Sequence, residues 1–88
     1  MKNRKTVIDV RRPEEYAAGH AEGSRNIPLQ EIENHLDEIR QIEQPVVLCC
    51  GGGTRSGKAA ELLRSHGINC ENGGSWKDVS ARQNNGEL

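Results

Sequence analysis

The chain has 88 residues, of which 12 are lysine or arginine and 13 are aspartate or glutamate, and its formal net charge is -1. This length allows one small domain and leaves no room for a second folded unit. Because the two signs of charge are interspersed, there is no basic stripe for nucleic acid and no polybasic segment for a membrane surface. We therefore expect a monomer. We expect its partners to be a small molecule and a thiol, and this thiol can belong to a protein.

The cysteines indicate free thiols. They are 3 in number, and Cys49 and Cys50 are adjacent, so they do not form an ordinary disulfide framework. A reducing compartment fits this usage, and no stretch approaches the roughly 20 apolar residues of a membrane span. We expect a cytoplasmic protein from the sequence as written, or a periplasmic one if Met1 replaces a removed leader.

The first part of the chain alternates between extended and helical patterns. Residues 6–10 are mostly β-branched and predict a strand. Pro13 suits the first turn of the short helix that follows, and Gly19 ends it. Residues 24–27 predict a second extended segment, because Pro28 pushes the residue before it out of the α region.

The middle of the chain predicts a helix and then a buried strand. Apolar residues recur at spacings of three and four over residues 29–42, which predicts an amphipathic helix. Residues 45–50 form a continuous apolar run, as expected of a central parallel strand that is covered on both faces.

The last part predicts a helix around residues 59–63 that ends at Gly67, and then a strand over residues 68–70 before two glycines break the chain. The fold class is therefore α/β, with a small parallel sheet flanked by helices on both faces. We place the domain at residues 1–80 and expect the polar residues 81–88 to be a flexible tail. Ligands of such folds bind outside the carboxyl ends of the strands, where Cys50 and its glycines lie.

The segment that joins the buried strand to the next helix, residues 49–58 (CCGGGTRSGK), fits three chemical templates. Counted from Gly52, it is the G-x-x-x-x-G-K pattern of a nucleotide phosphate-binding loop. Ala59 then stands where serine or threonine would bind magnesium. The missing hydroxyl and the short chain disfavour this template.

The other two templates use a thiolate. Counted from Cys49, the segment is C-x5-R, in which a thiolate attacks a phosphoester while arginine holds the phosphate. Counted from Cys50, it is C-x-x-G-x-R, a loop one residue shorter that would surround a persulfide sulfur. The loop by itself leaves both frames open, because the glycines at 51–53 satisfy either one.

Three groups of motifs follow one another along residues 6–79. The first group is residues 7–11 (VIDVR), 13–16 (PEEY), 19–20, 23 and 26–29 (NIPL). The second is residues 45–48 with Cys50, Gly53, Arg55 and Ser56, and the third is residues 71–74 and 78–79. In order and register, they resemble the N-terminal signature, the catalytic segment and the closing motif of the rhodanese-like domain family. Among its single-domain members, the chain resembles most the phage shock protein E type.

The resemblance implies a thiosulfate:acceptor sulfurtransferase that works through a cysteine persulfide, with cyanide or a thiol as acceptor and without metal or cofactor. Cys50 matches the family's catalytic cysteine. The small anionic sulfur donor would be bound by the residues that follow it, Gly51, Gly52, Gly53, Thr54 and Arg55.

Two alternatives come with the same fold. Phosphatases and arsenate reductases use the longer loop, for which the nucleophile would be Cys49, but a histidine usually precedes it and here Leu48 does. A non-catalytic binding module would dock a partner through the loop without turnover. Such modules usually lose the cysteine, so the presence of Cys50 favours an enzyme.

Arg55 is the single cation of the loop, and it has two possible roles. It can anchor the anionic donor, or it can pair with an acid and brace the loop; we favour donor contact.

Other residues are expected to be structural. We expect Asp9 and Arg11 to form an ion pair and His20 to brace its loop through a hydrogen bond. Cys49 should point away from Cys50 and behave as a small hydrophobe. A zinc site is disfavoured, because adjacent strand cysteines diverge and the spacing is not standard; its ligands would be Cys49, Cys50, His66 and Cys70.

Overall fold

A computed structural model describes residues 5–88, which contain a sheet of four strands in the order β2-β1-β3-β4. Every neighbouring pair of strands is parallel, as the alternating pattern of strands and helices predicts. The strands are β1 (Val7–Asp9), β2 (Arg25–Asn26), β3 (Val46–Cys50) and β4 (Cys70–Ser75).

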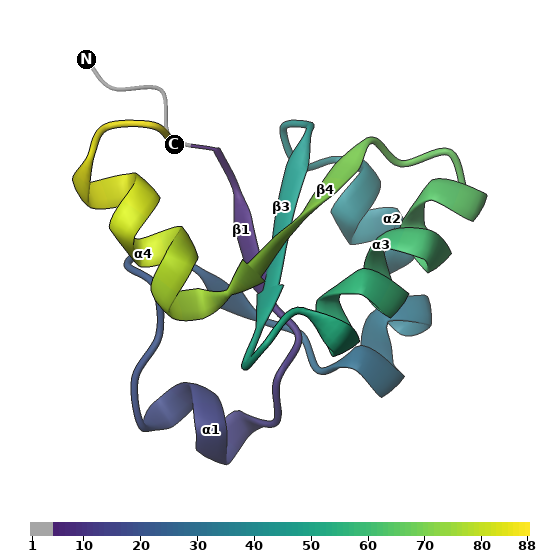
Figure 1. Ribbon diagram of the computed structural model, residues 1–88. Helices are drawn as coiled ribbons and strands as arrows, with labels where there is room; N and C mark the ends of the chain where they lie inside the picture. The colour runs from purple at the N-terminus through teal and green to yellow at the C-terminus, as the bar shows by residue number, and fades with distance from the viewer. Residues whose placement is uncertain (1–4) are drawn as a thin grey trace.

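Helices cover both faces of the sheet, which confirms the predicted α/β fold class. Figure 1 shows α2 and α3 on one side of the sheet, α4 on the other, and α1 near the end of the strands that leads into α3. Within residues 5–88, no helix combines the length and apolar character needed to cross a membrane. The helices are α1 (Pro13–Ala17), the 3₁₀ helix η1 (Leu29–His35), α2 (Leu36–Arg40), α3 (Thr54–Ser65) and α4 (Trp76–Asn84).

Strand β3 is the centre of the core, and all of its residues are buried. Because successive side chains of a strand point to opposite faces, β3 contributes to two hydrophobic clusters. Leu48 and Cys50 belong to the larger cluster, which includes residues of η1, α2 and α3. Val47 and Cys49 belong to the smaller one, beneath α4. The predicted divergence of Cys49 and Cys50 is therefore confirmed.

The segment predicted as one amphipathic helix over residues 29–42 is two short helices. Residues 29–35 form the 3₁₀ helix η1, and α2 starts only after His35, whose backbone leaves helical geometry at φ -117° and ψ 15°. The apolar face is as predicted, because Ile32 and Ile39 are buried. The spacing of three between Leu29 and Ile32 suits a 3₁₀ turn as well as an α turn, so the pattern does not separate the two.

The prediction that the last strand ends before Gly73 and Gly74 is wrong. Strand β4 runs through both glycines to Ser75, with a shift of register against β3 between Leu48 and Cys49. A Cβ built on Gly73 would lie 2.7 Å from Val79 Cγ2 and 2.8 Å from Val47 Cγ1. Glycine is needed here because α4 packs closely on the sheet. In the sequence alone, the two adjacent glycines predicted the end of the strand.

Residues 81–84, the first half of the expected polar tail, belong to a helix that the sequence pattern did not predict. Helix α4 continues to Asn84, and Leu88 is buried beside Val79 in the smaller cluster. The helix starts after Ser75, whose hydroxyl accepts a hydrogen bond from the backbone N–H of Asp78 at 3.1 Å. Its apolar face consists of few residues, so the hydrophobic pattern of this polar segment did not indicate a helix.

Gly73→Ala should destabilise the protein, because the added methyl group overlaps two buried valine side chains. We expect the free energy of unfolding to fall by about 1–3 kcal/mol, the usual range for overpacking. Urea unfolding followed by circular dichroism measures this. Gly52→Ala is the matched control, since a Cβ there meets no atom within 4 Å. Equal stability of the two variants would contradict the close packing of α4 on β4.

Candidate active site

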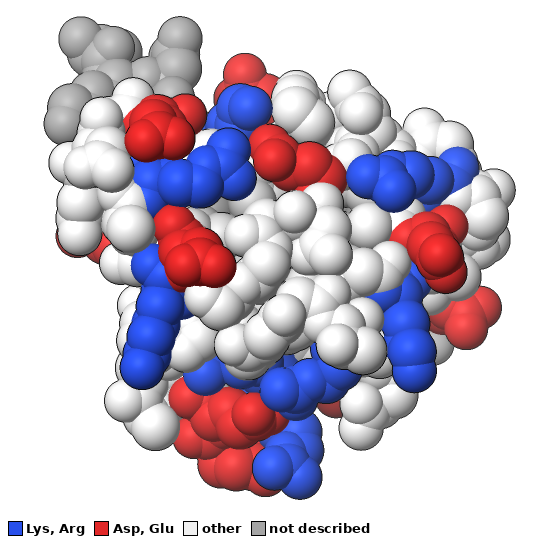
Figure 2. Space-filling view, in the orientation of Figure 1, with Lys and Arg blue, Asp and Glu red and all other residues white. Residues whose placement is uncertain are grey.

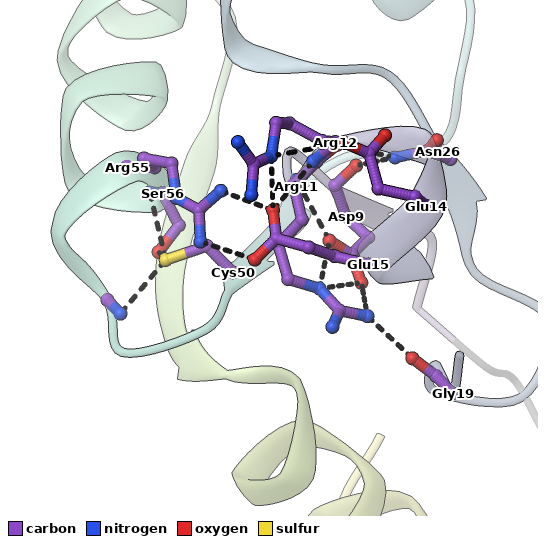
Figure 3. A network of polar contacts seen from close by, with 11 residues as sticks. Asp9, Arg11, Arg12, Glu14, Glu15, Gly19, Asn26, Cys50, Arg55 and Ser56 are labelled. Atoms are coloured by element: carbon purple, nitrogen blue, oxygen red, sulfur yellow. Dashed lines mark hydrogen bonds and ion pairs between the residues drawn. The ribbon is translucent and has the colours of Figure 1, made fainter. Parts of the chain in front are cut away.

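The site lies where the connections of the sheet change direction. Strand β1 leads to β2 on one side, whereas β3 leads to β4 on the other, so the segments that follow β1 and β3 diverge. In open parallel sheets, this divergence creates a crevice at the carboxyl ends of the strands. Cys50 ends β3 at this place, and Figure 3 shows it near the residues that follow β1.

Backbone N–H groups surround the Cys50 sulfur. The N–H of Gly53 donates to Sγ at 2.9 Å, and the N–H of Ser56 lies 3.4 Å from it. Gly53 has a left-handed φ of 101°, a conformation that glycine adopts readily and that turns the chain into α3. The loop thereby forms a small anion-binding nest around a cysteine that is only 1% exposed.

These contacts favour the thiolate. Burial alone raises the pKa of Cys50, but hydrogen bonds from the Ser56 hydroxyl and from the N–H groups of Ser56, Gly53 and Gly52 act against it. The net result is a pKa below the ordinary value of a thiol. The positive end of α3 favours the anion in the same direction. Cys50 therefore has the electrostatic surroundings of a nucleophile.

Cys49 has the opposite environment. It is fully buried on the other face of the sheet, and burial together with the nearby Asp9 carboxylate raises its pKa to about 12. Cys70 lies in the same cluster as Cys50, but its sulfur faces the carbonyl of Ala60 at 3.5 Å, and burial raises its pKa. Among the cysteines, only Cys50 has a lowered pKa, which favours the shorter of the two loop frames.

Asn72 ties the loop to β4. Its side-chain oxygen accepts from the Ser56 hydroxyl at 2.6 Å and from the N–H of Gly74 at 3.0 Å. Its amide nitrogen donates to the carbonyl of Gly53 at 3.0 Å. The buried Ser56 oxygen is also 3.3 Å from the Cys50 sulfur. Its single proton can point to Asn72 or to that sulfur, and an ionised Cys50, which only accepts, competes with Asn72 for it. Sequence reasoning assigned no role to Ser56 or Asn72, although both lie within the motifs of the resemblance.

Arg55 forms a forked ion pair with Glu15 of α1. Arg55 Nη1 is 2.7 Å from Glu15 Oε1, and Nη2 is 3.1 Å from Oε2 (Figure 3). The hydrogen bond from Arg55, with a second one from the backbone N–H of Arg12, lowers the pKa of Glu15 to about 2. The acid-paired brace considered for Arg55 is therefore present. The guanidinium also lies beside the loop, since a Cβ on Gly51 would be 3.2 Å from Nη2.

The other predicted loop residues lie at the rim. Gly51 and Gly52 are exposed on the turn, and Thr54 is exposed on the first turn of α3. The structure thus brings Cys50, Gly53 and Arg55 together and leaves Thr54 outside the contacts with sulfur.

The expected structural roles of Asp9, Arg11 and His20 agree with the geometry. Arg11 binds both carboxylate oxygens of Asp9, with Nη2 to Oδ2 at 2.8 Å, and the same nitrogen reaches the carbonyl of Gly19 at 2.7 Å. This buried pair fixes the turn into α1. The His20 ring stacks on Tyr16 and its Nδ1 is 2.8 Å from the Tyr16 carbonyl oxygen.

Cys50 should ionise at a lower pH than an unperturbed thiol, which has a pKa of about 8.5, because the folded loop stabilises the anion. The difference in ultraviolet thiolate absorbance between the wild type and Cys50→Ser, followed against pH, isolates this group without requiring a reagent to reach it.

Ser56→Ala should raise that midpoint, because the Ser56 hydroxyl can turn its proton toward the Cys50 anion and an alanine methyl group cannot. Ser65→Ala is the matched control, since its hydroxyl donates to Leu62 at the far end of α3. A Cys50 midpoint at or above the ordinary value, or one that Ser56→Ala leaves unchanged, would contradict this description of the loop.

Comparisons with known proteins show the family of the chain. The family described as the rhodanese-like domain matches residues 1–81. Thiosulfate sulfurtransferase PspE of Escherichia coli is 37% identical over 75 residues, which are 83% of this chain and 72% of that protein. Uncharacterized protein YqhL of Bacillus subtilis is 48% identical over 61 residues, and this match covers 69% of the chain but 48% of YqhL, about half of its length.

Solved structures give the same result. A rhodanese with anions from E. coli superposes with a TM-score of 0.78 at 35% identity, covering 88% of this chain and 93% of that one. The human single-domain sulfurtransferase TSTD1 superposes with a TM-score of 0.67 at 29% identity, covering 90% of this chain and 83% of TSTD1. The relatives PspE and TSTD1 are named as sulfurtransferases. As the resemblance in the sequence predicts, the chain belongs to the rhodanese-like domain family.

Proposed function

We propose that this protein transfers sulfane sulfur from thiosulfate, or from a similar small anionic donor, to a thiophilic acceptor through a persulfide on Cys50. The observation that carries the proposal is the Cys50 sulfur itself, which accepts backbone hydrogen bonds at the end of β3 and has a lowered pKa. These are the surroundings of an activated thiolate nucleophile. The sulfurtransferase relatives support the same chemistry.

The reaction has two displacement steps. In the first, the Cys50 thiolate attacks the outer sulfur of thiosulfate, a new S–S bond forms, and sulfite leaves with the electron pair of the broken S–S bond. In the second, cyanide or a thiolate attacks the outer sulfur of the persulfide, and the Cys50 thiolate leaves. Neither step needs a general base or a metal, because each nucleophile attacks as an anion and each leaving group departs as an anion.

The loop suits a persulfide as well as a thiolate. A persulfide carries its negative charge on the outer sulfur, and the N–H groups that act on Cys50 stabilise negative charge near it. Cys50 is almost completely buried, which favours small donors and keeps bulk water away from the intermediate. Arg55 lies beside Gly51 at the rim of the loop, where its charge would attract an anionic donor.

The geometry supports the alternatives less well. A phosphatase or arsenate reductase would need Cys49 as its nucleophile, but Cys49 is buried on the other face of the sheet and its pKa is raised to about 12. A non-catalytic binding module would have no need of a cysteine with a lowered pKa in an intact loop. We therefore favour an enzyme whose nucleophile is Cys50.

Cys50→Ser should abolish the formation of thiocyanate from thiosulfate and cyanide, because a serine hydroxyl forms no persulfide at this place. Cys49→Ser should keep most of the activity, because Cys49 lies on the other face of the sheet. The colorimetric thiocyanate assay measures both, with a thermal melt to show that each variant folds. An inactive Cys49→Ser together with an active Cys50→Ser would transfer the role of nucleophile to Cys49.

Arg55→Gln should weaken donor capture, because it removes the cation at the rim of the loop. We expect the KM for thiosulfate to rise more than kcat falls, with a loss of about 1–2 kcal/mol in kcat/KM. Lys58→Gln removes the same charge from an exposed position one turn further along α3 and is the control. If KM stays constant while kcat and the melting temperature both fall, Arg55 acts only as a brace between α3 and α1.

A further inference from the structure

The charges at the rim of the site are paired with one another. Arg55 is the single cation of the loop, and the Glu15 carboxylate holds two of its nitrogens, at 2.7 and 3.1 Å. The neighbouring Arg12 lies 3.5 Å from Glu14 and 3.6 Å from Glu15. The pKa of Glu15, about 2, keeps its carboxylate ionised at neutral pH. The region around the nucleophile therefore holds balanced charge, and Figure 2 shows basic and acidic side chains side by side over the surface in view.

This pairing bears on how an anion reaches the site. Any anion that binds Nη1 or Nη2 of Arg55 comes close to a carboxylate that already holds the same nitrogens. The donor must share the guanidinium with Glu15 or displace it, and like charges at such distances repel. The glycines at 51–53 add no positive side chain that would offset this repulsion. The repulsion from Glu15 increases with the negative charge on the rest of the donor, outside its transferable sulfur.

The transferable sulfur itself has a different environment. That sulfur approaches the N–H groups of Gly53 and Ser56, which hold the Cys50 sulfur, and the persulfide that forms there carries one negative charge. The loop thus accommodates one negative charge at the sulfur, whereas a second charge on the rest of the donor would lie near Arg55 and Glu15. A dianion such as thiosulfate carries both charges.

We propose that Glu15 is a specificity-determining residue, which neutralises Arg55 and makes the site prefer sulfur donors with a single negative charge, located on the transferable sulfur, over dianionic donors. This inference rests on the proposed sulfur transfer by Cys50 and names its donor class. Glu15 touches Arg55 rather than the reacting sulfur, so its effect appears in the relative KM values of donors and leaves kcat nearly unchanged.

Two donors of nearly equal size isolate the effect of charge. Methanethiosulfonate has a methyl group in place of one sulfonate oxygen of thiosulfate, and it carries one negative charge instead of two. Its reaction is balanced in the same way: the Cys50 thiolate attacks the outer sulfur, the donor S–S bond breaks, and methanesulfinate leaves with the electron pair. Persulfide formation is measured with cyanide as a common acceptor for both donors.

The variant to test is Glu15→Gln, and Glu14→Gln is its matched control. Glutamine keeps an oxygen that can accept from the backbone N–H of Arg12, the bond that Glu15 makes at 3.0 Å, so the start of α1 is preserved. Glu14→Gln removes the same charge one residue away, from an exposed side chain that lies 3.5 Å from Arg12. We expect Glu15→Gln to lower the KM for thiosulfate roughly threefold to tenfold and to change the KM for methanethiosulfonate less than twofold. Glu14→Gln should change neither.

The wild type alone gives a second measurement, which does not depend on how a variant folds. Its KM for methanethiosulfonate should be equal to or lower than its KM for thiosulfate. A severalfold lower KM for thiosulfate in the wild type would overturn the proposal, and so would a Glu15→Gln enzyme that changes the KM of both donors equally. In both cases Cys50 still takes up sulfur and the proposed function stands. If the wild type takes sulfur from neither donor, the proposed function fails together with the inference.

Discussion

The hydrogen bonds from the loop backbone to the Cys50 sulfur are the interaction on which the rest of the site depends. A sulfur that is 1% exposed would be an ordinary neutral thiol if burial acted alone, because a low dielectric disfavours its charged form. The N–H groups of Gly53 and Ser56 reverse this balance. They point inward because Gly53 adopts a left-handed conformation as the chain enters α3. The lowered pKa of the cysteine is thus a property of the backbone around it, which the whole fold maintains.

The sheet maintains that backbone by contacts from three sides. Strand β3 is covered on both faces, so Cys49 is held on one side of the sheet while Cys50 is presented on the other. Strand β4 contributes Asn72, which holds the Gly53 carbonyl and the Ser56 hydroxyl. The segment after β1 contributes Glu15, which binds Arg55 of the segment after β3, where these two segments diverge. Neighbouring thiols therefore differ widely in pKa although they are adjacent in sequence.

Local patterns in the sequence were sufficient for the features that depend on neighbouring residues. The buried strand, the glycine loop and the opposite orientations of Cys49 and Cys50 follow from hydrophobic runs and from the period of a strand. The pairing of Arg55 with Glu15 spans 40 positions, and no local pattern distinguishes it from contact with a donor. Gly73 looked like a chain break because its role is set by the side chains of Val47 and Val79, which only the packed structure brings together.

In the proposed mechanism, sulfur is held covalently on Cys50 during transfer. The most direct measurement is peptide mass spectrometry of the protein after brief treatment with thiosulfate and removal of the excess donor, followed by a second spectrum after cyanide is added. We expect one additional sulfur atom on the peptide that contains Cys50, assigned to that residue by fragmentation, and its loss in the second spectrum. Sulfur located on Cys49 or Cys70, or a protein that gains no sulfur from any donor and still passes sulfur to the acceptor, would contradict the claim.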